Sequence, residues 1–161
     1  MSATLAESAL RALQARGWTV GTAESLTGGL VVASLVDVPG ASASVRGGIV
    51  AYATDVKASA LGVDASLLAA HGPVHPDVAR QLAEGARSAL GVDVGIATTG
   101  VAGPEPQGGR AVGTVFVAVV TPEAAAVREL ALTGDRAEIR HAAVREALEL
   151  CVANVPEVPG A

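Results

Sequence analysis

The spacing of apolar residues along the chain changes between the period of a helix and that of a strand. From residue 5 to residue 13, apolar side chains recur every three or four positions, after the capping-box pattern Thr4-x-x-Glu7 and before Gly17. This arrangement is typical of an amphipathic helix. Short β-branched or alternating runs predict strands. The predicted strands cover residues 18–23, 47–53, 93–98, 113–120 and 125–132, and the further predicted helices cover 30–36, 54–61, 64–70, 75–90 and 136–153.

Strands that alternate with helices predict an α/β protein. We expect a single three-layer α/β/α domain over residues 1–161, with a mixed sheet of about five or six strands and a flexible tail at 155–161. The run 113–120 is almost entirely β-branched or small, so we expect it to be buried on both faces. Pro122-Glu123 follows this run and predicts an antiparallel hairpin with 125–132.

The stretch from Thr22 to Leu30 joins the first predicted strand to the second helix, so Ser25 falls in a strand-to-helix turn. Gly28 and Gly29 would let a ligand approach the backbone closely, and the free N–H groups of a first helical turn attract anions or a developing oxyanion. The alternative is a purely structural turn in which Ser25 or Thr27 caps the helix.

Composition narrows the classes of ligand. The net charge is −5 and aromatic residues make up 2% of the chain, whereas a nucleic-acid surface needs a basic stripe or a stacking platform. We therefore expect a small-molecule ligand and no nucleic-acid partner. Gly, Pro or a charge interrupts every apolar run before membrane length, and the start of the chain does not resemble a secretory signal. A cytoplasmic protein without a membrane partner is expected.

Lys57 is the only lysine among eleven basic residues, and Tyr52, five positions before it, is the only tyrosine. Lysine can lose its proton when its surroundings lower its pKa, whereas arginine cannot, so a retained lysine suggests a general base. Thr54 is the predicted N-cap of the helix that carries Lys57, and the positive end of that helix would favour the neutral amine. Chance survival of one lysine is the alternative.

Other reactive side chains point to structural roles. Cys151 lies on a helical apolar pattern and is expected to be a small buried hydrophobe. His71 and His75 have the spacing of a metal pair, but Gly72 and Pro73 forbid the continuous helix that such a pair needs, so no metal site is predicted. The loop from residue 100 to residue 113 is rich in Gly and Pro, and its length favours a functional loop.

Four blocks of sequence resemble the C-terminal domain of the CinA family, which also includes stand-alone nicotinamide-nucleotide amidases of the PncC type. The blocks are Thr22-Ala23-Glu24-Ser25-Leu26-Thr27-Gly28-Gly29, Tyr52-x4-Lys57-x3-Leu61-Gly62-Val63, Thr99-Gly100-Val101-Ala102-Gly103-Pro104 and Val112-Gly113-Thr114-Val115, and Gly134-Asp135-Arg136 also fits. The chain departs from the family pattern at three places: Leu26 replaces a cysteine, His75 replaces a serine, and Glu105-Pro106-Gln107 replaces further glycines. Glu105 would repel a phosphate if it pointed into the site.

The resemblance implies hydrolysis of the carboxamide of nicotinamide mononucleotide to nicotinate mononucleotide and ammonia, without a metal or other cofactor. Carried onto this chain, the implied catalytic residues are Ser25, Lys57 and Tyr52. Neutral Lys57 would take the proton of Ser25 during attack, and Tyr52 would orient the lysine or relay the proton to ammonia. A nucleotide-binding or regulatory module without turnover is the alternative function.

Two loops can supply the contacts to the substrate. One would form the oxyanion hole and the other would hold the ribose phosphate, and the sequence leaves open which does which. The expected substrate-binding residues are Thr27, Gly28, Gly29, Thr99, Gly100 and Gly103. Arg46, Arg110 and Arg136 are available to neutralise a phosphate, but nothing in the sequence selects one of them. The apolar excess favours self-association, most simply a two-fold dimer.

Overall fold

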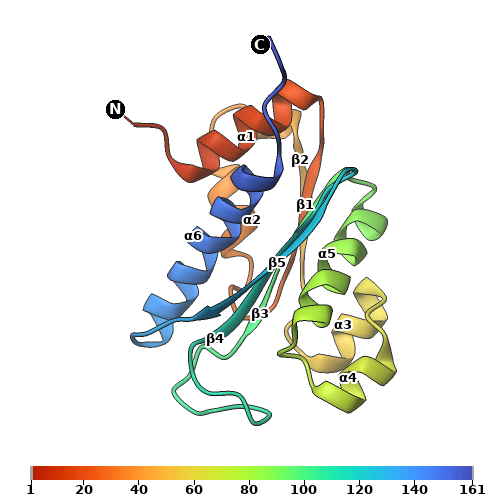
Figure 1. Cartoon of the computed structure of the whole chain (residues 1–161), viewed down its shortest axis with the longest axis vertical. Coiled ribbons are helices and arrows are strands. Elements are labelled where there is room, and N and C mark those ends of the chain that lie inside the picture. The colour runs from red at the N-terminus through yellow and green to blue at the C-terminus, as the bar shows by residue number, and fades with distance from the viewer. Residues whose placement is uncertain (1, 161) are drawn as a thin grey trace.

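The computed structural model describes residues 2–160 and shows one sheet with helices on both faces (Figure 1). Its helices are α1 (Leu5–Arg16), α2 (Leu30–Val36), α3 (Thr54–Leu61), α4 (Ala65–His71), α5 (Pro76–Leu90) and α6 (Arg136–Asn154), with a short 3-10 turn at Ala41–Ala43. Its strands are β1 (Val20–Glu24), β2 (Val45–Val50), β3 (Val94–Gly100), β4 (Thr114–Val120) and β5 (Ala125–Ala131). Within residues 2–160, no helix has both the length and the apolar character of a membrane span.

The sheet has the order β2-β1-β3-β4-β5, which confirms the predicted mixed α/β sheet. Strands β2, β1 and β3 are parallel, whereas β4 pairs antiparallel with both β3 and β5. The predicted hairpin between the last two strands is therefore confirmed. Six of the seven residues of β4 are buried because helices cover both faces of the sheet at this strand.

Two apolar layers hold the helices to the sheet (Figure 1). Helices α1, α2 and α6 bury Leu13, Leu35 and Ile139 against one face. On the other face, α5 buries Leu82 against a layer that includes Phe116 of β4. Each such side chain contributes about 1.5–3 kcal/mol when it leaves water, so the two layers fix the strand ends at which the site lies.

Local signals explain most of the helix ends, with two differences from prediction. The capping box of α1 is present, and a second one starts α6, where the Asp135 side chain accepts a hydrogen bond from the Glu138 N–H at 2.9 Å. The predicted N-cap at Thr54 is wrong, because Ala53 is the N-cap of α3 and makes no side-chain bond. Val155, assigned to the tail, is only 3% exposed, because its apolar side chain packs into the core beside α6.

The chain leaves β1 toward β2 through α2 and returns to β3 through α3, α4 and α5 on the opposite face (Figure 1). The carboxyl ends of β1 and β3 therefore form a topological switch point. Crevices at such points are the usual ligand sites of parallel α/β sheets. Ser25 follows β1 directly, so the fold places it at this crevice.

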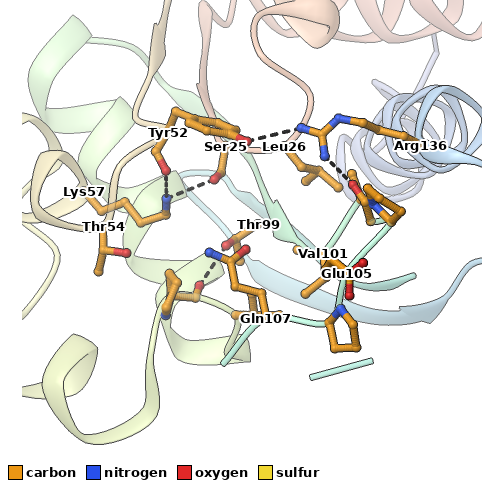
Figure 2. A pocket seen from close by; sticks show the side chains of 17 residues that line it. Ser25, Leu26, Tyr52, Thr54, Lys57, Thr99, Val101, Glu105, Gln107 and Arg136 are labelled. Carbon is orange, nitrogen blue, oxygen red and sulfur yellow. Dashed lines mark hydrogen bonds between the residues drawn. The ribbon is translucent and has the colours of Figure 1, made fainter. Parts of the chain in front are cut away.

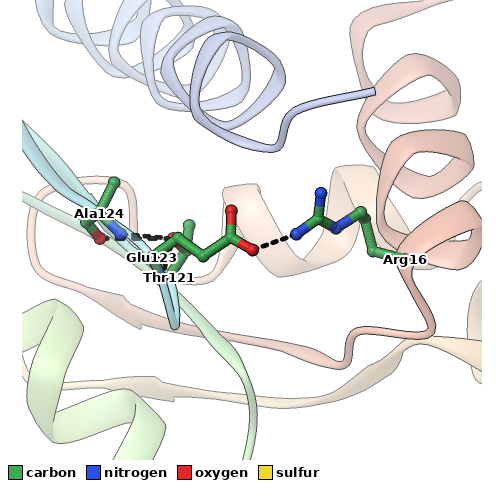
Figure 3. Close-up of polar contacts among 4 residues, drawn as sticks. All are labelled: Arg16, Thr121, Glu123 and Ala124. Carbon is green, nitrogen blue, oxygen red and sulfur yellow. Dashed lines mark hydrogen bonds and ion pairs between the residues drawn. The ribbon is translucent and has the colours of Figure 1, made fainter. Parts of the chain in front are cut away.

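The β4–β5 turn is tied to the end of α1, away from the switch point (Figure 3). The Thr121 hydroxyl accepts hydrogen bonds from the N–H groups of Glu123 and Ala124, at 3.1 and 3.0 Å. This turn presents the Glu123 carboxylate to the Arg16 guanidinium, which forms an ion pair with it. Because the Glu123 side chain is largely exposed, the pair contributes at most about 1 kcal/mol.

Candidate active site

Ser25 and Lys57 meet at the switch point, as the sequence predicts for a nucleophile and its base. The Lys57 amine lies 2.9 Å from the Ser25 hydroxyl oxygen (Figure 2). Ser25 is 7% exposed and Lys57 is 1% exposed, and Lys57 is the largest fully buried side chain among residues 2–160. Ser25 comes from the turn after β1 and Lys57 from the start of α3, so the two side chains approach from different sides of the crevice.

The contacts of the Lys57 amine suit its neutral form as well as its ammonium form. The amine also donates to the carbonyl oxygens of Ala51 at 2.8 Å and Tyr52 at 3.1 Å. A neutral amine has two N–H donors and one lone pair, so two carbonyls and the Ser25 hydroxyl together satisfy it fully. In that state the Ser25 O–H donates to the amine nitrogen, which is the arrangement that a general base needs.

Burial lowers the pKa of Lys57 from 10.5 to about 8. An ammonium ion loses its hydration in a dry site, and among residues 2–160 Lys57 forms no salt bridge that would offset this loss. The amine is therefore partly neutral near pH 7, which its ordinary pKa would not allow.

The lowered pKa of Lys57 predicts a pH-dependent effect on stability. The unfolded chain binds a proton at this lysine up to about pH 10.5 and the folded chain only up to about pH 8. Burial of Lys57 therefore destabilises the wild type fully below pH 8, and the effect disappears between pH 8 and pH 10.5. We expect the free energy of unfolding of Lys57→Met to exceed that of the wild type by the largest margin below pH 8, and this margin to decline between pH 8 and pH 10.5. Urea unfolding at pH 7, 9 and 10.5 measures the difference, and a difference independent of pH would contradict the assignment.

A buried carboxylate, which the sequence did not single out, occupies the start of α2. Glu24 is 1% exposed, and its oxygens accept hydrogen bonds from five donors. The donors are the hydroxyls of Thr22 (3.0 Å) and Thr27 (2.7 Å) and the N–H groups of Gly29 (3.2 Å), Val31 (2.8 Å) and Val32 (3.0 Å). Glu24 thus takes the place of an external anion at this helix end. The sequence signal for this role is weak, because Glu24 ends β1 and lies six positions before Leu30, the first residue of α2.

This carboxylate changes the predicted role of the glycine turn. The Gly28 N–H donates to the Ser25 carbonyl at 3.1 Å, and the Gly29 N–H donates to the Glu24 carboxylate at 3.2 Å. The Thr27 hydroxyl contacts Glu24 and, at 2.8 Å, Thr98. The N–H groups of Gly28 and Gly29 and the Thr27 hydroxyl therefore serve the turn itself, whereas the Thr27 N–H does not.

Four backbone N–H groups beside Ser25 have no hydrogen-bond partner among residues 2–160. Leu26 and Thr27 supply two of them, immediately after the serine, and Ala102 and Gly103 supply two from the loop after β3. Buried N–H groups are normally paired, so free ones next to a nucleophile are candidates for binding an oxyanion.

A pocket of about 260 Å³ opens over the serine and lysine (Figure 2). Its lining residues are Ser25, Leu26, Tyr52, Thr54, Lys57, Pro73, Val74, Thr99, Gly100, Val101, Ala102, Gly103, Pro104, Glu105, Pro106, Gln107 and Arg136. The expected contacts Thr99, Gly100 and Gly103 are in this set, whereas Thr27, Gly28 and Gly29 are not. Glu105 also lines the pocket, from an exposed part of the loop.

The Tyr52 side chain does not occupy the place that was predicted for it. Its carbonyl, and not its phenol, contacts the Lys57 amine. The side chain is 63% exposed, and its hydroxyl accepts a hydrogen bond from Arg136 at 3.2 Å (Figure 2). Tyr52 therefore orients the lysine through its backbone, and the structure shows no phenol bond that would relay a proton from Lys57.

Arg136 is the one of the three candidate arginines that lines the pocket. It lies at the first position of α6 and also donates to the Gly103 carbonyl. Arg110 instead stacks over the Phe116 ring, 5.6 Å from its centroid, and Arg46 is an exposed residue of the edge strand β2.

The other reactive residues lie outside the pocket lining. Cys151 is buried, as predicted, and burial raises the pKa of its thiol to about 12. The His71 and His75 rings lie 4.6 Å apart, and His75 caps α5 by accepting the Asp77 N–H at 3.1 Å. Residues 2–160 contain no group of three or more His, Cys, Asp or Glu side chains that could hold a metal.

The fold and this site define an α/β protein with a buried serine–lysine pair at the carboxyl ends of its parallel strands. The family model described as the CinA C-terminal domain matches residues 2–155, and the chain belongs to this family. A CinA-like protein from Frankia casuarinae is 55% identical over 135 residues, which are 84% of this chain and 31% of that protein. A putative competence-damage inducible protein from Geobacillus kaustophilus is 46% identical over 138 residues, which are 85% of this chain and 33% of that protein. The chain thus spans about a third of the length of these relatives.

Solved structures share the fold over nearly their whole length. A CinA superfamily protein from Klebsiella pneumoniae superposes with a TM-score of 0.90 at 33% identity, covering 94% of this chain and 95% of that one. The competence/damage inducible protein CihA from Agrobacterium tumefaciens gives 0.87 at 35% identity, covering 95% and 98%. These likenesses confirm the family resemblance and the α/β fold.

Proposed function

We propose that the chain hydrolyses the carboxamide of nicotinamide mononucleotide to nicotinate mononucleotide and ammonia. The observation that carries the proposal is the 2.9 Å contact between the Ser25 hydroxyl and a lysine whose pKa is lowered to about 8. A serine oxygen becomes a nucleophile when an adjacent base can take its proton, and this pair lies at the floor of a pocket. The family membership supports the choice of substrate, since the resemblance implies this amide.

In the first half of the reaction, Ser25 Oγ attacks the carboxamide carbon while its proton passes to the neutral Lys57 amine. The C–O bond forms, and the carbonyl oxygen becomes an oxyanion. When this intermediate collapses, the C–N bond breaks and the Lys57 ammonium returns the proton to the leaving nitrogen, which departs as ammonia. Lys57 acts as base and then as acid, so no proton from the Tyr52 phenol is required.

In the second half, water hydrolyses the acyl-enzyme. Lys57, neutral again, accepts a proton from the attacking water, and the oxygen of that water bonds to the acyl carbon. Collapse breaks the bond to Ser25 Oγ, which regains its proton from the Lys57 ammonium. The products are the nicotinate nucleotide and an unchanged Ser25–Lys57 pair.

The two loops, which the sequence left interchangeable, take different roles in this proposal. Leu26 follows the nucleophile and lines the pocket, and its N–H has no partner among residues 2–160, which favours this N–H as an oxyanion donor. The start of α2 already holds the Glu24 carboxylate, so a substrate phosphate there would meet a like charge. We therefore place the phosphate at Arg136 and the Gly100–Gly103 segment, where the Arg136 guanidinium would have to offset the like charge of Glu105.

Arg136→Ala is expected to raise KM for nicotinamide mononucleotide about 10- to 100-fold with little change in kcat, because a charge-assisted hydrogen bond to the phosphate contributes roughly 1.5–3 kcal/mol. Steady-state kinetics with the nucleotide and with the corresponding nucleoside, which lacks the phosphate, measure the effect. The KM for the nucleoside should change little in Arg136→Ala. Tyr52→Phe is the matched control, because it removes the hydrogen bond between Tyr52 and Arg136 but leaves the Arg136 charge in place. If Arg136→Ala raised KM equally for the nucleotide and the nucleoside, the assignment would be contradicted.

Ammonia release from nicotinamide mononucleotide by the purified chain tests the proposed function directly. Calorimetric binding of the same nucleotide to Ser25→Ala should be measured in parallel. We expect turnover by the wild type and binding by both proteins. Binding without turnover would overturn the hydrolysis and favour the nucleotide-binding module instead.

Self-association is a separate proposal. Val36 and Val50 are 60% and 47% exposed, which leaves apolar side chains on α2 and on the edge strand β2 available for a second copy. Light scattering on the purified chain tests for the dimer.

A further inference from the structure

Arg140 of α6 holds the turn that carries Ser25, although it is absent from the pocket lining. Its Nε donates to the Leu26 carbonyl at 2.8 Å and a terminal nitrogen donates to the Thr27 carbonyl at 3.2 Å. Within residues 2–160 it forms no salt bridge, so its charge is directed at these two carbonyls. Arginine is the preferred cation for buried ion pairs, whereas the half-buried Arg140 guanidinium has two backbone carbonyls as its partners.

Each of these carbonyls belongs to a peptide unit that leads back to the nucleophile. The Thr27 carbonyl shares a planar peptide with the Gly28 N–H, which donates to the Ser25 carbonyl at 3.1 Å. The Ser25 carbonyl in turn shares a peptide with the Leu26 N–H, the free donor on the pocket lining. A continuous chain of two peptide units therefore runs from the Arg140 guanidinium to that donor.

The second contact acts on the neighbouring donor. The Leu26 carbonyl shares its peptide with the Thr27 N–H, the other free N–H in the turn, so Arg140 fixes the plane of that unit directly. Hydrogen bonds in such a chain polarise one another, and a cation on the carbonyl side strengthens the N–H at the far end as a donor. Between Ser25 and Ala33, Leu26 and Thr27 supply the N–H groups without partners among residues 2–160, and Arg140 acts on both.

The turn is built to admit this side chain. Gly28 has a φ of +60°, and a Cβ at this position would lie 3.2 Å from an Arg140 terminal nitrogen. A glycine here both allows the left-handed turn and leaves room for the guanidinium. Glu24 holds the same turn from the opposite end, through Gly29 and the start of α2.

We propose that Arg140 is a positioning residue for the oxyanion hole: it orients and polarises the peptide units that present the Leu26 and Thr27 N–H groups beside Ser25. This inference rests on the proposed function in that it assigns an oxyanion hole to a serine nucleophile. It extends that function by naming a residue, 115 positions from Ser25 in sequence, that sets the strength of the hole without touching the substrate.

The test measures acylation-like chemistry at Ser25 with a probe that does not depend on the natural substrate. A small alkyl fluorophosphonate reacts by forming a bond from Ser25 Oγ to phosphorus and releasing fluoride, while the serine proton passes to Lys57. Its phosphoryl oxygen needs the same oxyanion donors. We expect the second-order rate of labelling, followed by intact mass, to fall about 10- to 100-fold in Arg140→Ala, somewhat less than the loss of a direct donor.

Arg145→Ala is the matched control, since Arg145 is an exposed arginine of the same helix, and it should label within about twofold of wild type. Millimolar guanidinium should restore part of the rate to Arg140→Ala, which a loss of stability alone would not allow. With nicotinamide mononucleotide, kcat should fall and KM should stay unchanged. If Arg140→Ala does not fold, Arg140→Lys is compared with the wild type instead. Lysine keeps the charge but cannot donate to both carbonyls as the guanidinium does, so this variant should also be labelled more slowly than the wild type.

Labelling of the folded variant at the wild-type rate, or a slow rate that guanidinium cannot restore, would overturn the inference. A wild type that is labelled at Ser25 but releases no ammonia from the nucleotide would overturn the proposed substrate and leave the role of Arg140 to be decided by the labelling rates. The two failures are therefore distinguishable.

Discussion

Ser25→Ala is expected to lower the rate of ammonia release from nicotinamide mononucleotide on the order of 10⁶-fold, as removal of a serine nucleophile does in serine hydrolases. Without the hydroxyl, no acyl-enzyme forms, and the neighbouring amine has no oxygen to activate. The fold should persist, because the Ser25 hydroxyl makes a side-chain hydrogen bond to Lys57 alone among residues 2–160. The turn itself is held by hydrogen bonds between backbone groups. An assay of ammonia at saturating substrate, with thermal unfolding in parallel, measures both outcomes.

Ser44→Ala is the control for this experiment. Ser44 is also buried, at 2% exposure, but it lies directly before β2 and is not part of the pocket lining. It should retain nearly full activity. If Ser25→Ala also released ammonia at more than a few per cent of the wild-type rate, hydrolysis would have to proceed by direct attack of water, and the covalent route would be wrong.

The serine–lysine pair could be predicted from sequence because two independent signals converged on it. A glycine-containing turn between a strand and a helix placed Ser25 at the edge of the sheet, and the retention of one lysine suggested a role that arginine cannot fill. The strand order explains why they meet: β1 and β2 are parallel neighbours, so the segments after their carboxyl ends share one edge. The helices and strands followed equally well from hydrophobic spacing and caps, as α1 and α6 show.

Roles that depend on a side chain's direction could not be predicted in the same way. Sequence gave no means to tell that Tyr52 would contribute its carbonyl, because backbone contacts leave no trace in residue type. It also expected substrate contacts at Gly28 and Gly29, since glycine permits close approach, whereas the Glu24 side chain folds back onto that helix end. Arg140 acts on a turn more than a hundred residues earlier, and only tertiary structure joins the two.

Lys57→Arg is expected to lower kcat/KM about 10³-fold or more at pH 7, within the range that general bases contribute, although it preserves the positive charge. The reason is that the guanidinium stays protonated at every pH the protein survives. In the wild type, a pKa of about 8 leaves about one lysine in ten neutral at pH 7, against about one in three thousand at its ordinary pKa. Burial of this side chain therefore increases the population of the reactive form about 300-fold.

The pH dependence gives this prediction a second measurement. Because the active form of Lys57 is the deprotonated one, wild-type kcat/KM should rise about tenfold per pH unit below pH 8 and level off above it, whereas the residual activity of Lys57→Arg should be nearly flat from pH 6 to pH 9. Stopped assays of ammonia in overlapping buffers at constant ionic strength determine both profiles. Retention of most activity by Lys57→Arg, or a wild-type profile that falls as pH rises through 8, would mean that another group takes the Ser25 proton. The 2.9 Å contact would then orient the serine without activating it.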